Sequence, residues 1–138
     1  MKEKVTVEVI INVEREKVWD FFNDPAHIVK WNHASDDWHS PRAENDLRVG
    51  GRFNTRMEAK DGSEGFDFIG TYTEVVEPER FAYTMDDGRT VSVTFEEMRN
   101  STYVKTLFDP EDENSIEMQK EGWQAILDNF KKYAESRG

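Results

Sequence analysis

The sequence of 138 residues contains no cysteine. Disulfide bonds, thiolate nucleophiles and thiolate metal ligands are therefore excluded, together with the enzyme classes that depend on them. Basic residues are also scarce, because 18 Lys and Arg stand against 29 Asp and Glu, for a formal charge of -11. Such a charge repels phosphate backbones and anionic lipid, so we expect no nucleic-acid partner.

Long apolar runs are missing as well. No stretch approaches the roughly 20 apolar residues that a membrane-spanning helix requires. The first residues, MKEKVTVEV, alternate where a signal peptide has a continuous apolar run. We therefore expect no membrane insertion and a cytoplasmic location. Hydrophobic residues still make up 36% of the chain and aromatic residues 12%, which predicts one core and a single domain over residues 1–138.

The first part of the chain combines one strand with two short helices. Apolar residues at every second position predict a half-buried strand, and they are Val5, Val7, Val9, Ile11 and Val13. From Glu14 the apolar spacing becomes helical, which predicts a helix that ends at about Asn23. Asp24 as a cap and Pro25 at the first helical position predict a second helix that ends near Asn32.

The rest of the chain is predicted to hold a loop, a meander of strands and one long helix. Residues 32–46 show no clear period, so we expect a long loop that carries Trp38, and loops of this length are often binding loops. Turn signals divide residues 47–109 into five segments rich in β-branched and aromatic residues, which predicts antiparallel strands. A helix with a wide apolar face is predicted over residues 116–136, lying across the sheet.

This order of elements predicts an α+β domain in which the long helix packs on a curved antiparallel sheet of about six strands. Four stretches also resemble one known family: VWDFF over 18–22 followed by Trp31, DLRVGGRF over 46–53, GTYTEVVEPERF over 70–81, and Gly122-Trp123. Together they resemble the START-like (SRPBCC) family of activators of the ninety-kilodalton heat-shock chaperone ATPase. The resemblance covers nearly the whole chain and implies the helix-grip fold of the birch-pollen-allergen type.

The helix-grip fold implies a cavity between the sheet and the C-terminal helix. Related families on this fold carry lipids or hormones, cyclise aromatic polyketides or activate the chaperone, so the fold alone selects no function. The chain resembles the C-terminal half of the chaperone activator, and the separate domain that supplies much of the chaperone contact has no room in it. We therefore expect a small hydrophobic molecule as partner and no direct activation of the chaperone, with monomer and homodimer both open.

Two features of the sequence point to the cavity. Gly122 lies in the middle of the long helix, where glycine costs about 1 kcal/mol relative to alanine, so either close packing or ligand space is expected there. A mixture of rings and thioethers suits an irregular pocket, although plain core packing is the alternative. We predict a pocket for an apolar or aromatic ligand that enters near Trp38. Its predicted lining is Trp31, Trp38, Phe53, Met57, Phe66, Phe68, Tyr83, Met85, Met118, Gly122 and Ile126.

Polar residues near this lining are candidates for catalysis, and the best are His33, His39, Arg56, Asp67 and Tyr72. Histidine titrates near neutrality, arginine holds a carboxylate or enolate, and burial raises the pKa of a carboxyl group. No nucleophile, base and orienting group share a recognisable spacing, so local hydrogen bonding at the surface is the favoured interpretation. The alternative functions are an enzyme of the polyketide cyclase/dehydratase type and a stress-related interaction module.

The pattern of histidines does not favour a metal site. His27, His33 and His39 are six residues apart, whereas helical ligands need separations of three or four. The pairs Asp61-Gly62 and Asp87-Gly88 indicate turns, because the alternating oxygen ligands of a calcium loop are missing. No nucleotide-binding motif is present either, so we expect neither a metal nor a cofactor.

Overall fold

One antiparallel sheet and three helices make up the protein, and the computed structural model describes residues 3–137. The sheet has seven strands in the order β1-β7-β6-β5-β4-β3-β2. In chain order the elements are β1 (Val5–Ile11), α1 (Arg15–Asn23), α2 (Pro25–Trp31), β2 (Trp38–Asn45), β3 (Arg52–Ala59), β4 (Gly65–Val76), β5 (Arg80–Met85), β6 (Thr90–Met98), β7 (Ser101–Phe108) and α3 (Ile116–Arg137).

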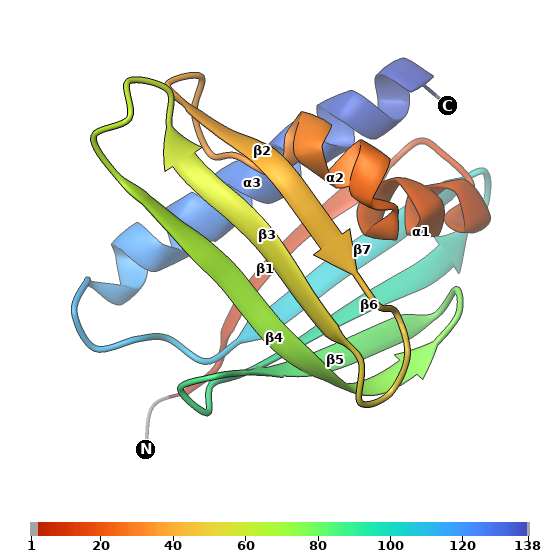
Figure 1. Cartoon of the computed structure of the whole chain (residues 1–138). Helices are drawn as coiled ribbons and strands as arrows, with labels where there is room; N and C mark the ends of the chain where they lie inside the picture. The colour runs from red at the N-terminus through yellow and green to blue at the C-terminus, as the bar shows by residue number, and fades with distance from the viewer. Residues whose placement is uncertain (1–2, 138) are drawn as a thin grey trace.

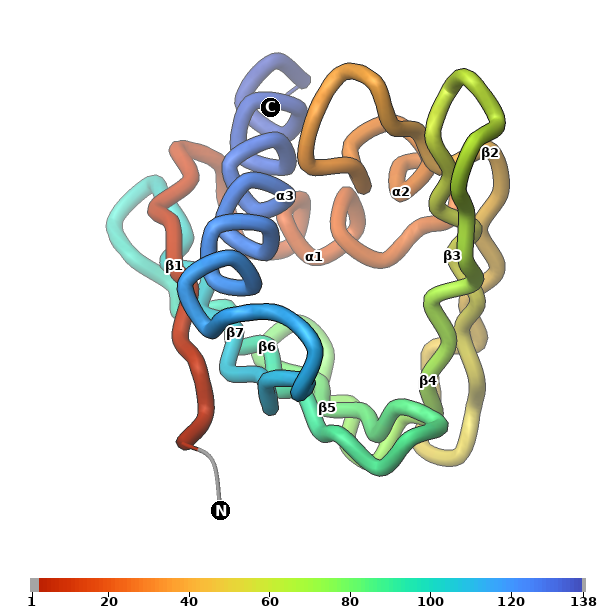
Figure 2. The backbone as a smooth tube through the Cα atoms, turned by 90° about the vertical axis from the view of Figure 1, so that its left-hand side faces the viewer, coloured from red at the N-terminus to blue at the C-terminus, as the bar shows by residue number. Residues whose placement is uncertain are grey.

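The sheet curls around α3, so the predicted α+β helix-grip architecture is confirmed (Figure 1). Viewed from the side, α3 faces β3 and β4 across the interior, while α1 and α2 close one end (Figure 2). A break in register between Tyr72 and Glu74 in β4 marks a bulge, which increases the bend of a strand. None of the helices within residues 3–137 is long and apolar enough to cross a membrane.

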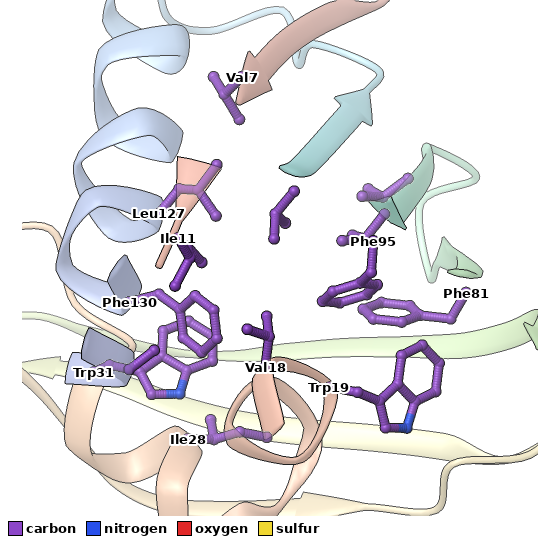
Figure 3. Packing of buried hydrophobic residues seen from close by; sticks show 14 of the residues in the cluster. Val7, Ile11, Val18, Trp19, Ile28, Trp31, Phe81, Phe95, Leu127 and Phe130 are labelled. Carbon is purple, nitrogen blue, oxygen red and sulfur yellow. The ribbon is translucent and has the colours of Figure 1, made fainter. Parts of the chain in front are cut away.

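The core lies where the C-terminal half of α3 meets α1 and α2 (Figure 3). The ring of Phe130 is fully buried and lies 4.8 Å from that of Trp31 and 4.9 Å from that of Phe22, measured between centroids. Trp19 of α1 meets Phe95 of β6 edge-on at 5.2 Å. Burial of each such side chain contributes about 1.5–3 kcal/mol, so this aromatic cluster fixes α3 against the sheet.

Side chains of α3 also bind the backbone of β1, which is an edge strand of the sheet. Gln124 donates to the carbonyl of Glu8 at 3.0 Å and accepts from the amide of Glu8 at 3.3 Å. About two and three turns further along, Lys131 donates to the carbonyl of Ile10 and Glu135 accepts from the amide of Asn12. Polar groups that an edge strand leaves unpaired are thereby satisfied by the helix.

The segment 32–46 differs from the prediction, because strand β2 occupies residues 38–45 where a long loop was expected. With β2 included the sheet has seven strands, where about six were predicted. β2 is an edge strand with exposed residues along much of its length, and its pairing with β3 is interrupted between His39 and Arg42, next to Pro41. An edge strand with a bulge and a proline shows no alternation, which explains why its sequence resembled a loop.

The first turn of α3 also differs from the predicted apolar stripe. Ile116 is 48% exposed and Met118 is 61% exposed, although both were expected to face the sheet. The inward position of this turn belongs to Gln119, which donates to the carbonyls of Glu111 and Asn114 at 3.1 and 2.9 Å. The first turn therefore holds the preceding loop through the side-chain amide of Gln119 and does not pack on the sheet.

Two glycines show opposite surroundings. A Cβ at Gly70 would lie 2.6 Å from the ring of Phe53 and 2.9 Å from that of Tyr83, because both rings fold over this position of β4. A Cβ at Gly122 would meet nothing within 4 Å. Gly122 is therefore not explained by the close packing that its position in the helix suggested.

These surroundings predict opposite effects for the same substitution. Gly122→Ala should raise the free energy of unfolding by about 0.5–1 kcal/mol, because alanine is the better helix former and has room. Gly70→Ala should lower the free energy of unfolding by about 1–3 kcal/mol, because two packed rings must move. Urea unfolding followed by circular dichroism measures both free energies. Equal effects of the two substitutions would contradict the close packing described around Gly70.

Asp109 joins three strands at the end of the sheet. Its carboxylate accepts from Lys4 at 2.9 Å, and from the amide and the hydroxyl of Thr90 at 2.8 and 2.9 Å. The Lys4 ammonium and the Thr90 donors lower the pKa of Asp109 from 3.8 to about 2. The folded state therefore favours the charged form of Asp109. The stabilisation that this carboxylate contributes is complete above about pH 4 and is lost as the pH falls towards 2.

Asp109→Asn should therefore destabilise the protein at pH 7 by on the order of 1 kcal/mol, a value reduced for solvent screening of a partly exposed group. The difference from the wild type should shrink between about pH 4 and pH 2. Thermal unfolding across this pH range tests the prediction. Asp20→Asn is a suitable control, because Asp20 is exposed and forms no ion pair among the described residues. A destabilisation by Asp109→Asn that does not change with pH would exclude this role of the charge.

Candidate functional site

The space between α3 and the strands β3 to β6 contains a pocket of about 560 Å³. This volume lies within the roughly 300–1,000 Å³ usual for small-molecule sites. The apolar and aromatic lining consists of Val7, Phe22, Ile28, Trp31, Phe53, Met57, Phe66, Phe68, Ile69, Tyr72, Phe81, Tyr83, Met85, Val93, Trp123, Ile126 and Leu127. The polar lining consists of Asn23, Asn32, Asn45, Thr55, Asp67, Asp86, Asp87, Arg89 and Thr106.

Strand register builds the aromatic floor of the pocket. Phe53 of β3 lies opposite Gly70 of β4, and Tyr72 of β4 lies opposite Tyr83 of β5. Since Gly70 has no side chain, the ring of Phe53 reaches over it and meets the ring of Tyr83 edge-on at 4.7 Å. Side chains of one face alternate along each strand, so these rings all point inward.

The helix side of the pocket is held by another stacked pair. Trp123 of α3 stacks on Phe108 of β7, with centroids 4.1 Å apart and planes at 8°. Trp123 also meets Phe68 of β4 at 6.1 Å, so its indole reaches from the helix towards the opposite wall. The N-terminal half of α3 is thus kept at a distance from β4 by rings, and Ile126 on the next turn lines the space between them.

A chain of hydrogen bonds runs along one wall of the pocket. The hydroxyl of Tyr72 donates to the side-chain oxygen of Asn45 at 2.6 Å, and Asn45 donates to the carbonyl of Asn23 at 2.7 Å. Asn23 in turn donates to the carbonyl of Trp19 at 3.0 Å. Burial raises the pKa of Tyr72 above its ordinary value, so its hydroxyl stays a neutral donor.

Tyr83 is the second buried tyrosine of the pocket, and its hydroxyl has a different environment. The residue is 6% exposed, and its hydroxyl has no hydrogen-bond partner within residues 3–137. Burial raises the pKa of Tyr83 well above its ordinary value. A neutral hydroxyl without a protein partner therefore lies in the wall of an apolar pocket.

Charged residues gather at one part of the pocket lining, around the turn between β5 and β6. Asp87 accepts from Arg89 at 2.7 Å, and Asp86 pairs with Arg52 at 3.1 Å. Asp67 of β4 lies 3.7 Å from the guanidinium of Arg56. Each carboxylate is paired with an arginine, so opposite charges are matched along this rim of the apolar interior.

The structure brings most of the predicted lining residues together around the pocket and leaves three outside. Met118 is exposed on the first turn of α3, where Gln119 takes the inward position, and Gly122 does not line the pocket. Trp38 begins the edge strand β2, where its ring lies 6.2 Å from that of Phe66 and does not line the pocket. The predicted residues that line the pocket are Trp31, Phe53, Met57, Phe66, Phe68, Tyr83, Met85 and Ile126.

The candidate catalytic residues do not form one cluster. His39 lies 3.5 Å from Glu58, and Arg56 bonds the same Glu58 at 2.8 Å, within an ionic network that Asp67 joins at the rim. Tyr72 lies inside the pocket on a different face of the sheet. The sheet thus separates His39 and Arg56 from Tyr72, as alternation along β3 already indicated for Arg56, whereas Asp67 pairs with Arg56 and also lines the pocket.

The three histidines occupy separate environments. Burial lowers the pKa of His33, whose Nδ1 is buried without a hydrogen-bond partner among the described residues. His27 contacts the hydroxyl of Tyr133 at 2.5 Å. Within residues 3–137, no group of three or more His, Asp or Glu side chains is arranged to hold a metal ion.

Several lining residues were missed by the sequence analysis. Trp123 was assigned to the helix stripe without a role in the pocket, although its position next to Gly122 was known. Asn45 was placed in the expected loop, and Arg89 directly follows a turn signal, so neither showed an apolar periodicity. The helical spacing of Trp123 and Ile126, three residues apart, was the signal that could have identified the helix wall.

A curved antiparallel sheet that wraps a C-terminal helix, with an apolar pocket between them, defines the helix-grip or START-like class of protein. The model of the family described as Activator of Hsp90 ATPase homolog 1-like protein matches residues 12–135, so the chain belongs to this family.

Solved structures agree with this assignment. The AHSA1-like protein from Aeromonas hydrophila is 50% identical, with 96% of this chain and 92% of that chain covered and a TM-score of 0.90. A protein from Cytophaga hutchinsonii is also 50% identical, with the same shares covered and a TM-score of 0.84. A protein from Nitrosomonas europaea, 19% identical, covers 99% of this chain and 96% of its own with a TM-score of 0.85, which shows the shared fold alone. No curated protein matches the chain.

The two buried tyrosines predict the behaviour of the protein at high pH. In the unfolded chain Tyr72 and Tyr83 ionise near pH 10, whereas burial keeps both protonated in the folded protein. The unfolded state then binds fewer protons, so the free energy of unfolding should fall as the pH rises above about 10.

The variant Tyr72→Phe, Tyr83→Phe should show a smaller fall over the same range, measured by urea unfolding at pH 9 to 11. Tyrosinate absorbance measured in parallel should show that these two groups ionise together with unfolding. An early ionisation of both groups in the folded protein would contradict their burial.

Proposed function

We propose that this protein binds a small apolar or aromatic molecule in the pocket between α3 and the sheet. The observation that carries the proposal is the pocket itself, which combines about 560 Å³ of space with a wall of buried rings. Interiors are normally packed to the density of organic crystals, so space of this size in a chain of 138 residues supports a binding role.

Membership of the family supports the proposal, because proteins with this fold commonly bind hydrophobic ligands. The lining itself supports it too: the side chains of Met57 and Met85 adapt easily to the shape of a ligand, and the rings offer flat apolar contacts. A cytoplasmic location stays a prediction from the sequence.

The alternative functions have weaker support. A cyclase-type enzyme needs an acid or base beside the substrate, but His39 lies in the outer ionic network, and Tyr72 is a neutral hydroxyl committed to Asn45. An interaction module needs a contiguous apolar patch. The large exposed apolar residues are instead spread over three strands, a loop and the first turn of α3, and they are Ile10, Val49, Phe66, Met98, Ile116 and Met118.

A pair of substitutions on α3 tests the proposal with N-phenyl-1-naphthylamine, an uncharged fluorescent probe. Ile126→Trp places a large ring inside the pocket and should weaken binding by roughly tenfold or more, because overpacking a filled space costs about 1–3 kcal/mol. Met118→Trp adds the same ring at an exposed position of the same helix and should leave binding unchanged.

Fluorescence titration of the wild type and both variants gives the three dissociation constants. Circular dichroism shows whether each variant keeps the fold. Equal binding by all three proteins would show that the probe lies elsewhere, and an absence of binding to the wild type would count against the proposed function.

A further inference from the structure

We propose that the pocket selects an uncharged apolar or aromatic molecule that carries an oxygen acceptor, such as a carbonyl, held between the hydroxyl of Tyr83 and the guanidinium of Arg89. This inference rests on the proposed function, because it assigns a chemical class to the ligand of the same pocket.

The hairpin of β5 and β6 places the two side chains on the same face. Tyr83 pairs with Val91 across the two strands, and the amide of Met85 donates to the carbonyl of Arg89 at 2.7 Å. Arg89 is therefore the diagonal neighbour of Tyr83, and both line the pocket. Diagonal positions are about 7–8 Å apart, which long side chains span. A single ligand atom between the two side chains can thus contact both.

Tyr83 and Arg89 both have hydrogen-bond donors that are not used within residues 3–137. The hydroxyl of Tyr83 has no hydrogen-bond partner within residues 3–137, although the residue is 94% buried, as its 6% exposure implies. Arg89 uses Nε to bond Asp87 at 2.7 Å, and its two terminal amino groups have no hydrogen-bond partner within the same residues. A guanidinium only donates hydrogen bonds. A ligand group that satisfies both side chains must therefore be an acceptor.

The charges of the lining argue that this acceptor is uncharged. The lining contains the carboxylates of Asp67, Asp86 and Asp87 and one guanidinium, that of Arg89, while the arginines paired with Asp67 and Asp86 lie outside it. The whole chain carries a formal charge of -11, which adds to the repulsion of anions. A carboxylate ligand would be repelled by this negative charge. An ammonium ligand could not accept a hydrogen bond from Arg89. A carbonyl oxygen is both an acceptor and uncharged.

Three probes that share two phenyl rings separate these chemistries: benzophenone with a carbonyl, diphenylmethane without a polar atom, and diphenylacetate with a carboxylate. The wild type should bind benzophenone at least roughly fivefold more tightly than diphenylmethane, because its carbonyl gains hydrogen bonds from Tyr83 and Arg89. Diphenylacetate should bind more weakly than benzophenone. Displacement of N-phenyl-1-naphthylamine measures all three affinities.

Substitutions then assign the preference to its residues. Tyr83→Phe keeps the ring and should reduce the preference for benzophenone at least roughly twofold while diphenylmethane binds as before, because only the bond from Arg89 remains. Tyr72→Phe should keep the preference, because the hydroxyl of Tyr72 already bonds Asn45. Arg89→Met should also reduce the preference, and it provides the test if Tyr83→Phe fails to fold.

Equal binding of benzophenone and diphenylmethane to the wild type would overturn the carbonyl preference and leave the proposed apolar binding intact. Tighter binding of diphenylacetate would overturn the preference for an uncharged ligand. If neither uncharged probe binds, the proposed function itself fails, and this inference fails with it.

Discussion

A single α-helix is too narrow to cover the concave face of a seven-stranded antiparallel sheet, and the rest of the molecule follows from this mismatch. At one end α1 and α2 bring Phe22 and Trp31 against Phe130 of α3, so the interior is filled by rings. At the other end no helix assists, and the stacked pair of Trp123 and Phe108 holds α3 away from β4. The pocket is the volume that the helices leave between these ends.

The predictability of the fold depended on where each strand lies in the sheet. Interior strands face water on one side, so Phe53 and Met57 alternate with polar residues, and the alternation identified their strand and the face that turns inward. The edge strand β2 has no such contrast, since a bulge near Pro41 and exposure along its length remove the pattern. Its pairing is fixed by β3 and α2, and long-range contacts of this kind leave no local signal.

The residues of the candidate site also differ in how far the sequence could predict them. Apolar lining residues of the strands were predictable, because period two and the resemblance to a family with a cavity point to the same face. Met118 was misplaced because the rotation of the first turn of α3 is set by the hydrogen bonds of Gln119, a tertiary feature. Tyr83 was predicted as lining, but its freedom to donate depends on cross-strand register, and so does its proximity to Arg89.

The hydrogen bonds from α3 to β1 fix the position of one wall of the pocket. Gln124, Lys131 and Glu135 hold the backbone of the edge strand at three successive points along the helix. Sliding α3 by one turn would break all of these bonds at once and would also withdraw Phe130 from its cluster. The helix is therefore a fixed wall of the pocket, and the turn between β5 and β6 is held separately, by its own backbone hydrogen bonds and by the ion pairs of Asp86 and Asp87.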